Sequence, residues 1–189
     1  IKDFTVINTL KRLKSLWIQD ISINSIKDLK WDFSDFYNLY SFVFKSNTLN
    51  DLEDIDKILN NKNLLQLELG KNIKNIDALS KIKNFKCKTV EINLDNSVND
   101  ISPLKNINAE TLSIHGGTIS DLSFIDNSTI VNLNINDNVF KLNIKDDIEV
   151  NKKYKVDLPP IFTQSFENGK INESDKCFMY DDTDEITYD

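Results

Sequence analysis

The feature that most constrains this chain is a seven-residue motif that returns about every two dozen residues. The motif has the form apolar, any, small or acidic, apolar, any, any, apolar. Its copies begin at residues 1, 23, 49, 73, 98 and 119, so the intervals are 22, 26, 24, 25 and 21 residues. A nearly fixed period of this length indicates a chain built from stacked structural repeats. The copies read IKDFTVI, INSIKDL, LNDLEDI, IKNIDAL, VNDISPL and ISDLSFI.

A second motif, apolar-x-x-apolar-x-apolar, precedes every copy but the first and occurs once more after the last copy. Its last two apolar positions alternate as on a short strand with one buried face. Each unit is therefore predicted to be a strand, a turn and a return segment. One such unit cannot bury its own apolar face, so the units must stack. The apolar positions are Leu13, Leu16 and Ile18; Leu39, Phe42 and Phe44; Leu64, Leu67 and Leu69; Cys87, Val90 and Ile92; Ala109, Leu112 and Ile114; and Ile130, Leu133 and Ile135.

The return segments of the longer, earlier units are predicted to be helical. Asn50 and Glu53 have the spacing of a capping box, and an apolar stripe at helical spacing follows them. Ser102 and Pro103 are typical of an N-cap and a first helical position. The last two full units are shorter, which favours 3₁₀ turns or extended chain there. An aromatic group in the second unit is expected in the core on the convex side: Trp31, Phe33, Phe36 and Tyr37.

These motifs resemble the leucine-rich repeat, and more narrowly the internalin-like repeats of bacterial surface proteins, whose DISPL segment occurs at residues 100–104. The resemblance implies an α/β solenoid over residues 1–144. A parallel sheet of about six short strands would form its concave side, and short helices or 3₁₀ turns its convex side. The acidic position of the family motif falls on Asp51, Asp100 and Asp121, with Asn75 and Ser25 as variants. The family's turn asparagine, which caps buried backbone groups, falls on Asn47, Asn72 and Asn138.

The two ends of the chain depart from the repeat pattern. The first motif has no strand before it, so the chain is expected to begin inside a repeat. Residues 145–189 are expected to form a β-rich cap or a partial immunoglobulin-like module, as in internalin-like proteins. They contain the turn signal Asn168-Gly169 but are too few for a complete sandwich of about 100 residues.

The sequence offers little support for catalysis. His115 is the only histidine, and Ser113 or Ser120 could be drawn into a triad with it. No nucleophile elbow accompanies them, so His115 is expected to be an exposed residue at a strand end. Gly116-Gly117 lacks the frame of a phosphate-binding loop. We therefore expect no catalytic residue and no enzyme activity.

Metal and cofactor sites are not expected either. The acidic run Asp181, Asp182, Asp184 and Glu185 lacks the spacing and the glycine of an EF-hand, so it is interpreted as a solvated turn. Two cysteines far apart in sequence make neither a zinc site nor a disulfide framework. Cys87 falls on a buried strand position and is expected to be an inert core thiol, whereas the redox state of Cys177 is open.

The charge and hydropathy limit the kinds of partner. The formal net charge is −7, which argues against binding to a nucleic-acid backbone. No apolar run approaches the roughly 18 residues that a membrane helix needs, so direct membrane insertion is not expected.

The concave face of the predicted sheet is the best candidate site, because residues between the buried strand positions point out from it. Its N-terminal end is predicted to be apolar and aromatic, its centre acidic and its C-terminal end rich in amides. Exposed Trp and Tyr residues are enriched at protein-binding hot spots. The candidate binding residues are Trp17, Gln19, Tyr40, Val43, Lys45, Glu68, Lys71, Glu91, Asn93, His115 and Asn134.

The resemblance to internalin-like proteins implies a non-enzymatic binding module of a secreted or cell-surface bacterial protein. Such a module would dock a host or cell-surface protein on its concave face. Two alternatives stay open at this point. One is a structural spacer or self-association module of a larger surface protein, and the other is a cytoplasmic regulator or inhibitor that caps an enzyme. Two free cysteines would be compatible with the cytoplasmic alternative.

Overall fold

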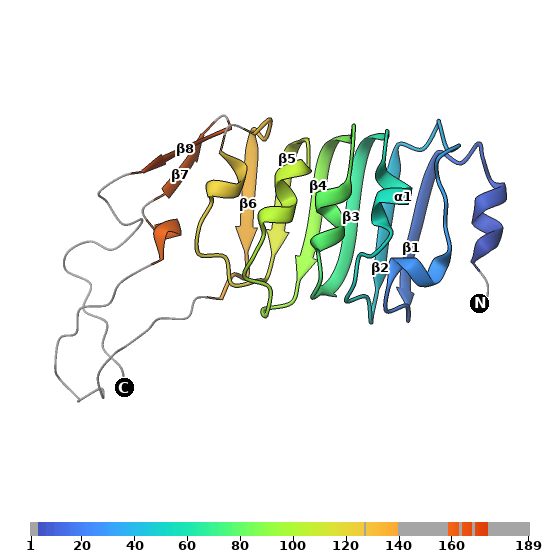
Figure 1. Cartoon of the computed structure of the whole chain (residues 1–189), viewed down its shortest axis with the longest axis horizontal. Helices are drawn as coiled ribbons and strands as arrows, with labels where there is room; N and C mark the ends of the chain where they lie inside the picture. Colours follow the sequence, from blue (N-terminus) through green and yellow to red (C-terminus); the bar gives the residue numbers. More distant parts are fainter. Residues whose placement is uncertain (1–3, 127, 140–158, 163, 168, 174–189) are drawn as a thin grey trace.

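The computed structural model of the protein describes residues 4–126, 128–139, 159–162, 164–167 and 169–173. Six strands form one parallel sheet, and their order in the sheet is their order in the chain (Figure 1). This confirms the predicted parallel sheet and gives an α/β, repeat-like arrangement. The strands are β1 (Ser15–Ile21), β2 (Ser41–Ser46), β3 (Asn63–Ile73), β4 (Lys86–Leu94), β5 (Ala109–His115) and β6 (Asn132–Asn136).

Short helices connect the strands along one face of the sheet (Figure 1). All but one are 3₁₀ helices. The return segments of the early units are therefore helical, as predicted, but only the third unit contains an α-helix. The expected capping box is wrong, since the N–H of Glu53 is bonded by Asp51 at 2.8 Å and the α-helix begins later. These helices are η1 (Thr5–Thr9), η2 (Ile26–Leu29), α1 (Ile55–Leu59), η3 (Asp77–Lys81), η4 (Ser102–Asn106) and η5 (Ser123–Ile125).

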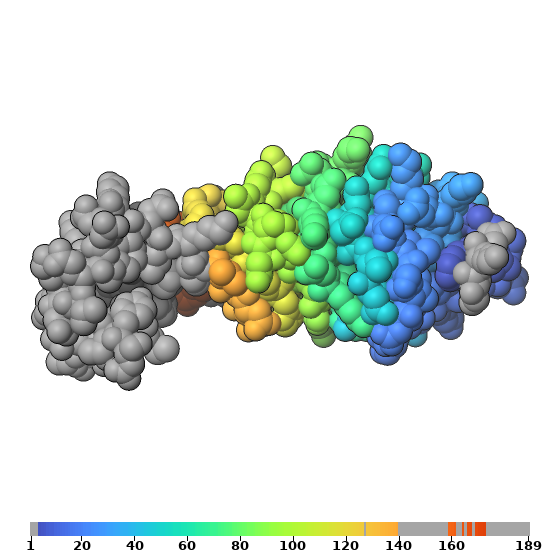
Figure 2. Space-filling view, turned by 90° about the horizontal axis from the view of Figure 1, so that it is seen from below, coloured from blue at the N-terminus to red at the C-terminus, as the bar shows by residue number. Residues whose placement is uncertain are grey.

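The register of the sheet aligns the predicted apolar positions from strand to strand. Two rows of side chains result, and the four inner strands bury theirs completely. Parallel pairing requires a crossover between neighbouring strands, and the short helices supply it while covering the apolar face. Figure 2 shows the units as consecutive bands along the long axis of the molecule. The first row is Leu16, Phe42, Leu67, Val90, Leu112 and Leu133, and the second is Ile18, Phe44, Leu69, Ile92, Ile114 and Ile135.

The aromatic group of the second unit packs against β2, on the face of the sheet that carries the short helices. Trp31, Phe33 and Phe36 are buried, and the ring centroids of Phe33 and Phe36 lie 4.4 Å apart. The indole N–H of Trp31 donates to the carbonyl oxygen of Phe4 at 2.9 Å, which ties the N-terminal segment to this cluster. Tyr37 is 83% exposed, so its expected place in the core is wrong.

The acidic position of the repeat motif has the same structural role in every unit where it is described. In the unit that contains DISPL, the carboxylate of Asp100 accepts the N–H of Ser102 at 2.9 Å, at the start of η4. Such a bond satisfies a donor that a short helix leaves without a partner. The hydrogen bonds from Ser102 hold the pKa of Asp100 below its ordinary value. The residues that make this bond to the N–H two positions later are Ser25, Asp51, Asn75, Asp100 and Asp121.

The turns after the strands follow the family pattern only in part. Asn138 accepts the N–H of Ile119 at 2.7 Å and donates to the carbonyl oxygen of the same residue at 2.9 Å, as predicted. In the third unit this role belongs to the fully buried Ser46, whose hydroxyl bonds both the N–H and the carbonyl of Ile23. The prediction for Asn47 is therefore wrong. Its side chain is exposed.

Cys87 lies on a buried strand position, as predicted. Burial raises the pKa of its thiol to about 11, so the reactive thiolate is scarce at neutral pH. This supports the expectation of an inert core thiol. Cys177 and the acidic run 181–185 lie outside the described residues.

A β-hairpin follows the repeats, formed by β7 (Gln164–Glu167) and β8 (Lys170–Glu173), with η6 (Pro160–Phe162) before it. Gly169 lies at the predicted turn with a φ of 79°. The buried amide of Gln164 accepts the N–H of Leu122 at 2.8 Å and donates to Asp121 at 2.7 Å. The hairpin is thereby fixed to the last repeat. The expected boundary at 144/145 and the segments 140–158 and 174–189 lie outside the described residues.

The bond at Asp100 gives a stability prediction. Asp100→Ala removes the acceptor for the Ser102 N–H and is expected to lower the free energy of unfolding by about 1 kcal/mol at pH 7. Asp100→Asn keeps an acceptor oxygen and is expected to cost less. The folded pKa is below the ordinary value of 3.8, so the contribution is complete above about pH 4 and is lost as the pH falls through the folded pKa.

Urea unfolding at pH 7 and at pH 3 measures both effects. The neighbouring exposed Asn99→Ala serves as the control and should change stability by less than about 0.5 kcal/mol. Equal losses for Asp100→Ala and Asn99→Ala would contradict this role of the motif.

Candidate protein-binding face of the sheet

The face of the sheet opposite the short helices carries the side chains that alternate with the core positions. We call it the open face. The same register that aligns the core also aligns this face into rows. The middle row is Trp17, Val43, Glu68, Glu91, Ser113 and Asn134; the row before it is Ser15, Ser41, Gln66, Thr89, Thr111 and Asn132; and the row after it contains Gln19 and Lys45, then Asn93, His115 and Asn136.

The structure places all the candidate residues from the sequence on these strands or directly beside them. Tyr40 directly precedes β2, and Lys71 lies near the end of β3. Two residues differ from the expectation of an exposed side chain: Glu68, which is 8% exposed, and Val43. Val43 is only 1% exposed, because it lies in the middle row between Trp17 and Glu68, whose longer side chains flank it.

The N-terminal end of the open face is apolar. Trp17 is 61% exposed, and its indole N–H donates to the hydroxyl of Ser41 on the next strand at 2.9 Å. The indole therefore reaches from β1 over β2. Tyr40 is 43% exposed, and Leu65 beside it is 59% exposed. We call Trp17, Tyr40 and Leu65 the apolar patch.

Leu65 is not among the candidate binding residues that the sequence predicts. The signal for it is positional, because Leu65 directly follows the first apolar position of its strand motif, as Tyr40 does in the preceding unit. The backbone N–H of Leu65 donates to the carbonyl oxygen of Tyr40 at 2.7 Å, which places the two residues side by side.

The centre of the open face is less acidic than the sequence predicts. Glu68 is buried and forms an ion pair with Lys45. The ammonium of Lys71 lies 2.7 Å from a carboxylate oxygen of Asp20 and 2.8 Å from the amide oxygen of Asn47. The lysines of the centre are therefore matched by carboxylates, and the pairs hold the side chains in fixed positions.

The C-terminal end of the open face is polar. The Nε2 atom of His115 lies 3.8 Å from a carboxylate oxygen of Glu91, and its Nδ1 atom lies 3.9 Å from one of Asp137. The amide of Asn134 donates to the hydroxyl of Ser113 at 3.1 Å, and Asn132 donates likewise to Thr111 at 3.3 Å. These amide–hydroxyl pairs agree with the predicted amide-rich end.

Metal sites and membrane-spanning helices were sought among the described residues. Within them, no group of three or more His, Cys, Asp or Glu side chains is arranged to hold a metal ion. Nor does any helix there have the length and apolar character needed to cross a membrane.

Comparison with known proteins adds no relative: no family model, no curated protein and no solved structure matches this chain.

The two tryptophans provide a direct check of this geometry. Trp17 is 61% exposed on the open face, whereas Trp31 is 3% exposed in the core. In the Trp31→Phe variant, the remaining fluorescence should be red-shifted and strongly quenched by acrylamide. In the Trp17→Phe variant, it should be blue-shifted and several-fold less quenched. Equal quenching of the two folded variants would contradict the exposed position of Trp17, and unfolding in urea should make them alike.

Proposed function

We propose that this chain is a leucine-rich-repeat solenoid that acts as a non-enzymatic protein-binding module of a bacterial secreted or cell-surface protein. The partner, a host or cell-surface protein, docks on the open face. The repeated strand motif, the shared bond of the acidic position and the turn at Asn138 support this fold and the resemblance to internalin-like repeats.

The observation that carries the proposal is the apolar patch. Three large apolar side chains on or directly beside three neighbouring strands are 43% to 61% exposed. Single exposed apolar residues are common on protein surfaces, whereas contiguous ones are typical of interaction sites. Trp and Tyr are also enriched among the residues that contribute most to binding free energy.

The rigidity of the patch adds to this argument. Trp17 is hydrogen-bonded to Ser41, and Tyr40 and Leu65 belong to a backbone that is paired on both sides. Side chains on a fixed backbone lose less conformational entropy on binding than those on loops. A paired strand is therefore a favourable support for hot-spot residues.

A self-association module is the second candidate, because the same exposed patch would suit a second copy of the chain. The two candidates differ in oligomeric state. A partner-binding module should remain a monomer at micromolar concentration, as measured by sedimentation equilibrium. A self-associating module should form dimers that the variant described next disrupts.

The experiment compares the parent with a Trp17→Ala/Leu65→Ala variant in capture from host-cell surface extracts. The captured protein is then purified, and its affinity is measured. We expect the variant to bind at least about tenfold more weakly, since truncation of hot-spot residues costs about 2 kcal/mol or more.

The matched control is Tyr37→Ala, which removes an exposed aromatic residue outside the strands. It should bind as the parent does, and all variants should have the circular dichroism of the parent. An affinity that is unchanged in Trp17→Ala/Leu65→Ala would move the binding site away from the open face.

A further inference from the structure

A row of exposed side chains crosses the sheet where its strands begin. The N–H of Tyr40 donates to the carbonyl oxygen of Lys14 at 2.9 Å, and the N–H of Leu65 donates to that of Tyr40 at 2.7 Å. The pairs Leu64–Cys87 and Gln66–Thr89 place Lys88 beside Leu65. We call the residues Lys14, Tyr40, Leu65 and Lys88 the strand-start row. All of them are exposed.

The strand-start row has a simple chemical order. Two cationic side chains enclose two apolar ones, and the apolar pair belongs to the apolar patch. Next after Lys88 comes Glu110, which ends the basic stretch.

The cations of this row differ from the other lysines of the open face. Lys45 and Lys71 form ion pairs with Glu68 and Asp20. Lys14 and Lys88 have no ion pair with any residue that the structure describes. Their ammonium groups are therefore available to a ligand in this part of the molecule.

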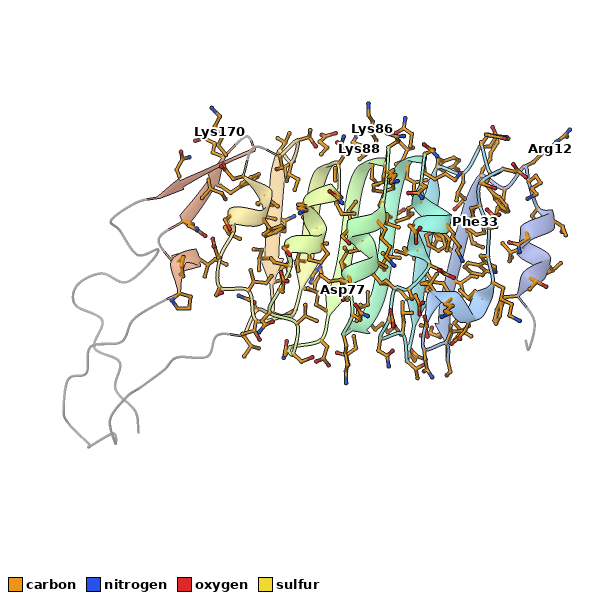
Figure 3. All side chains as sticks on the ribbon, in the orientation of Figure 1. Arg12, Phe33, Asp77, Lys86, Lys88 and Lys170 are labelled. Atoms are coloured by element: carbon orange, nitrogen blue, oxygen red, sulfur yellow. The ribbon has the colours of Figure 1, made fainter. Side chains whose placement is uncertain are left out.

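Two more cations lie at the same edge of the sheet. Figure 3 shows Lys86 and Lys88 at the upper edge, with Arg12 at the same edge farther along. Neither Arg12 nor Lys86 is ion-paired within the described part of the chain. The chain has a formal net charge of −7, so a local excess of cations here is opposite in sign to the whole molecule.

Because of salt screening, the local excess of cations determines the electrostatic attraction of a ligand at short range. The Debye length is about 8 Å at physiological ionic strength. Carboxylates on distant parts of the chain are screened at this distance, whereas the lysines beside the apolar pair would touch the ligand. The electrostatic complement of the strand-start row is therefore anionic.

We infer that the ligand of the open face is an acidic protein segment with an apolar side chain for the apolar patch and carboxylates for Lys14 and Lys88. This inference rests on the proposed function and names its partner class. Lys14 and Lys88 are three strand spacings apart, about 14 Å. An extended segment covers that distance with about four residues, so the two carboxylates would flank two or three residues that include the apolar one.

The apolar pair favours a protein segment over other anionic ligands. A nucleic-acid backbone calls for a broadly basic surface, and four cations on a chain with this net charge do not provide one. Two large apolar side chains between the lysines instead suit the side chains of a peptide.

A random library of displayed 12-residue peptides, selected on the folded full chain, tests the inference. The enriched peptides should combine a net negative charge with aromatic or leucine residues. One enriched peptide is then synthesised with a fluorophore, and its affinity is measured by anisotropy. Lys14→Gln/Lys88→Gln should bind it roughly tenfold more weakly, and the salt dependence of binding should be shallower than for the parent.

Lys81→Gln/Lys105→Gln is the matched control, since it makes the same change in net charge at exposed positions on η3 and η4. It should bind as the parent does. The inference is overturned if the library yields no peptide, if the enriched peptides are neutral or basic, or if Lys14→Gln/Lys88→Gln binds as tightly as the control. Binding of a DNA oligonucleotide or of anionic vesicles with higher affinity than the peptide would overturn it as well.

The Trp17→Ala/Leu65→Ala variant separates a failure of the acidic-segment inference from a failure of the proposed function. If Trp17→Ala/Leu65→Ala loses the peptide while Lys14→Gln/Lys88→Gln does not, the open face binds a partner but the acidic class is wrong. If neither pair of changes weakens binding, the proposed function fails too.

Discussion

The parallel pairing of each strand with the next is the interaction on which the rest of this structure depends. A single unit has a strand with two unpaired edges and one apolar face. Alone, it can neither pair the backbone groups of these edges nor bury the apolar face. Stacking solves both problems at once, because each backbone pair also brings the core side chains of neighbouring units into contact. The four inner strands accordingly bury both of their core positions completely.

The open face is a direct consequence of this pairing. Successive residues of a strand point to opposite faces, so the register that aligns Phe42 with Leu67 also aligns Val43 with Glu68. Rows of like position then run across the sheet on the exposed side. The strand therefore fixes the place of a binding residue, while only the residue type is left to vary from unit to unit.

The sequence predicts the sheet well for the same reason. The strand and its two buried core positions are properties of one unit, and each unit repeats them. The spacing between the copies then gives the period. The role of Asp100 and of its equivalents also follows from the local motif.

What the sequence does not predict depends on neighbours in space. The burial of Val43 requires that the side chains of Trp17 and Glu68 flank it, and these residues are 26 and 25 positions away. The pairing of Glu68 with Lys45 likewise joins two units. A pattern within one unit contains no information on how far such side chains reach.

The errors at single turns have a related cause. Ser46 takes the backbone-capping role that the family pattern assigns to Asn47, because Ser46 is the residue whose side chain enters the core at this turn. Tyr37 lies outside the core although Phe36 beside it is buried. Composition marks such a segment as aromatic, but the backbone decides which rings point inward.

The register of the sheet is the central claim, and disulfide cross-linking tests it most directly. In a Cys177→Ser background, Ser113→Cys/Asn134→Cys joins two positions that pair across β5 and β6. Their Cα atoms should be about 4.8 Å apart, within the range that a disulfide bridges. Thr111→Cys/Asn134→Cys is offset by two residues, about 8 Å, and is too long. The account predicts rapid oxidation of the first pair and little of the second. Preferential cross-linking of the offset pair would contradict the register, and with it the open face.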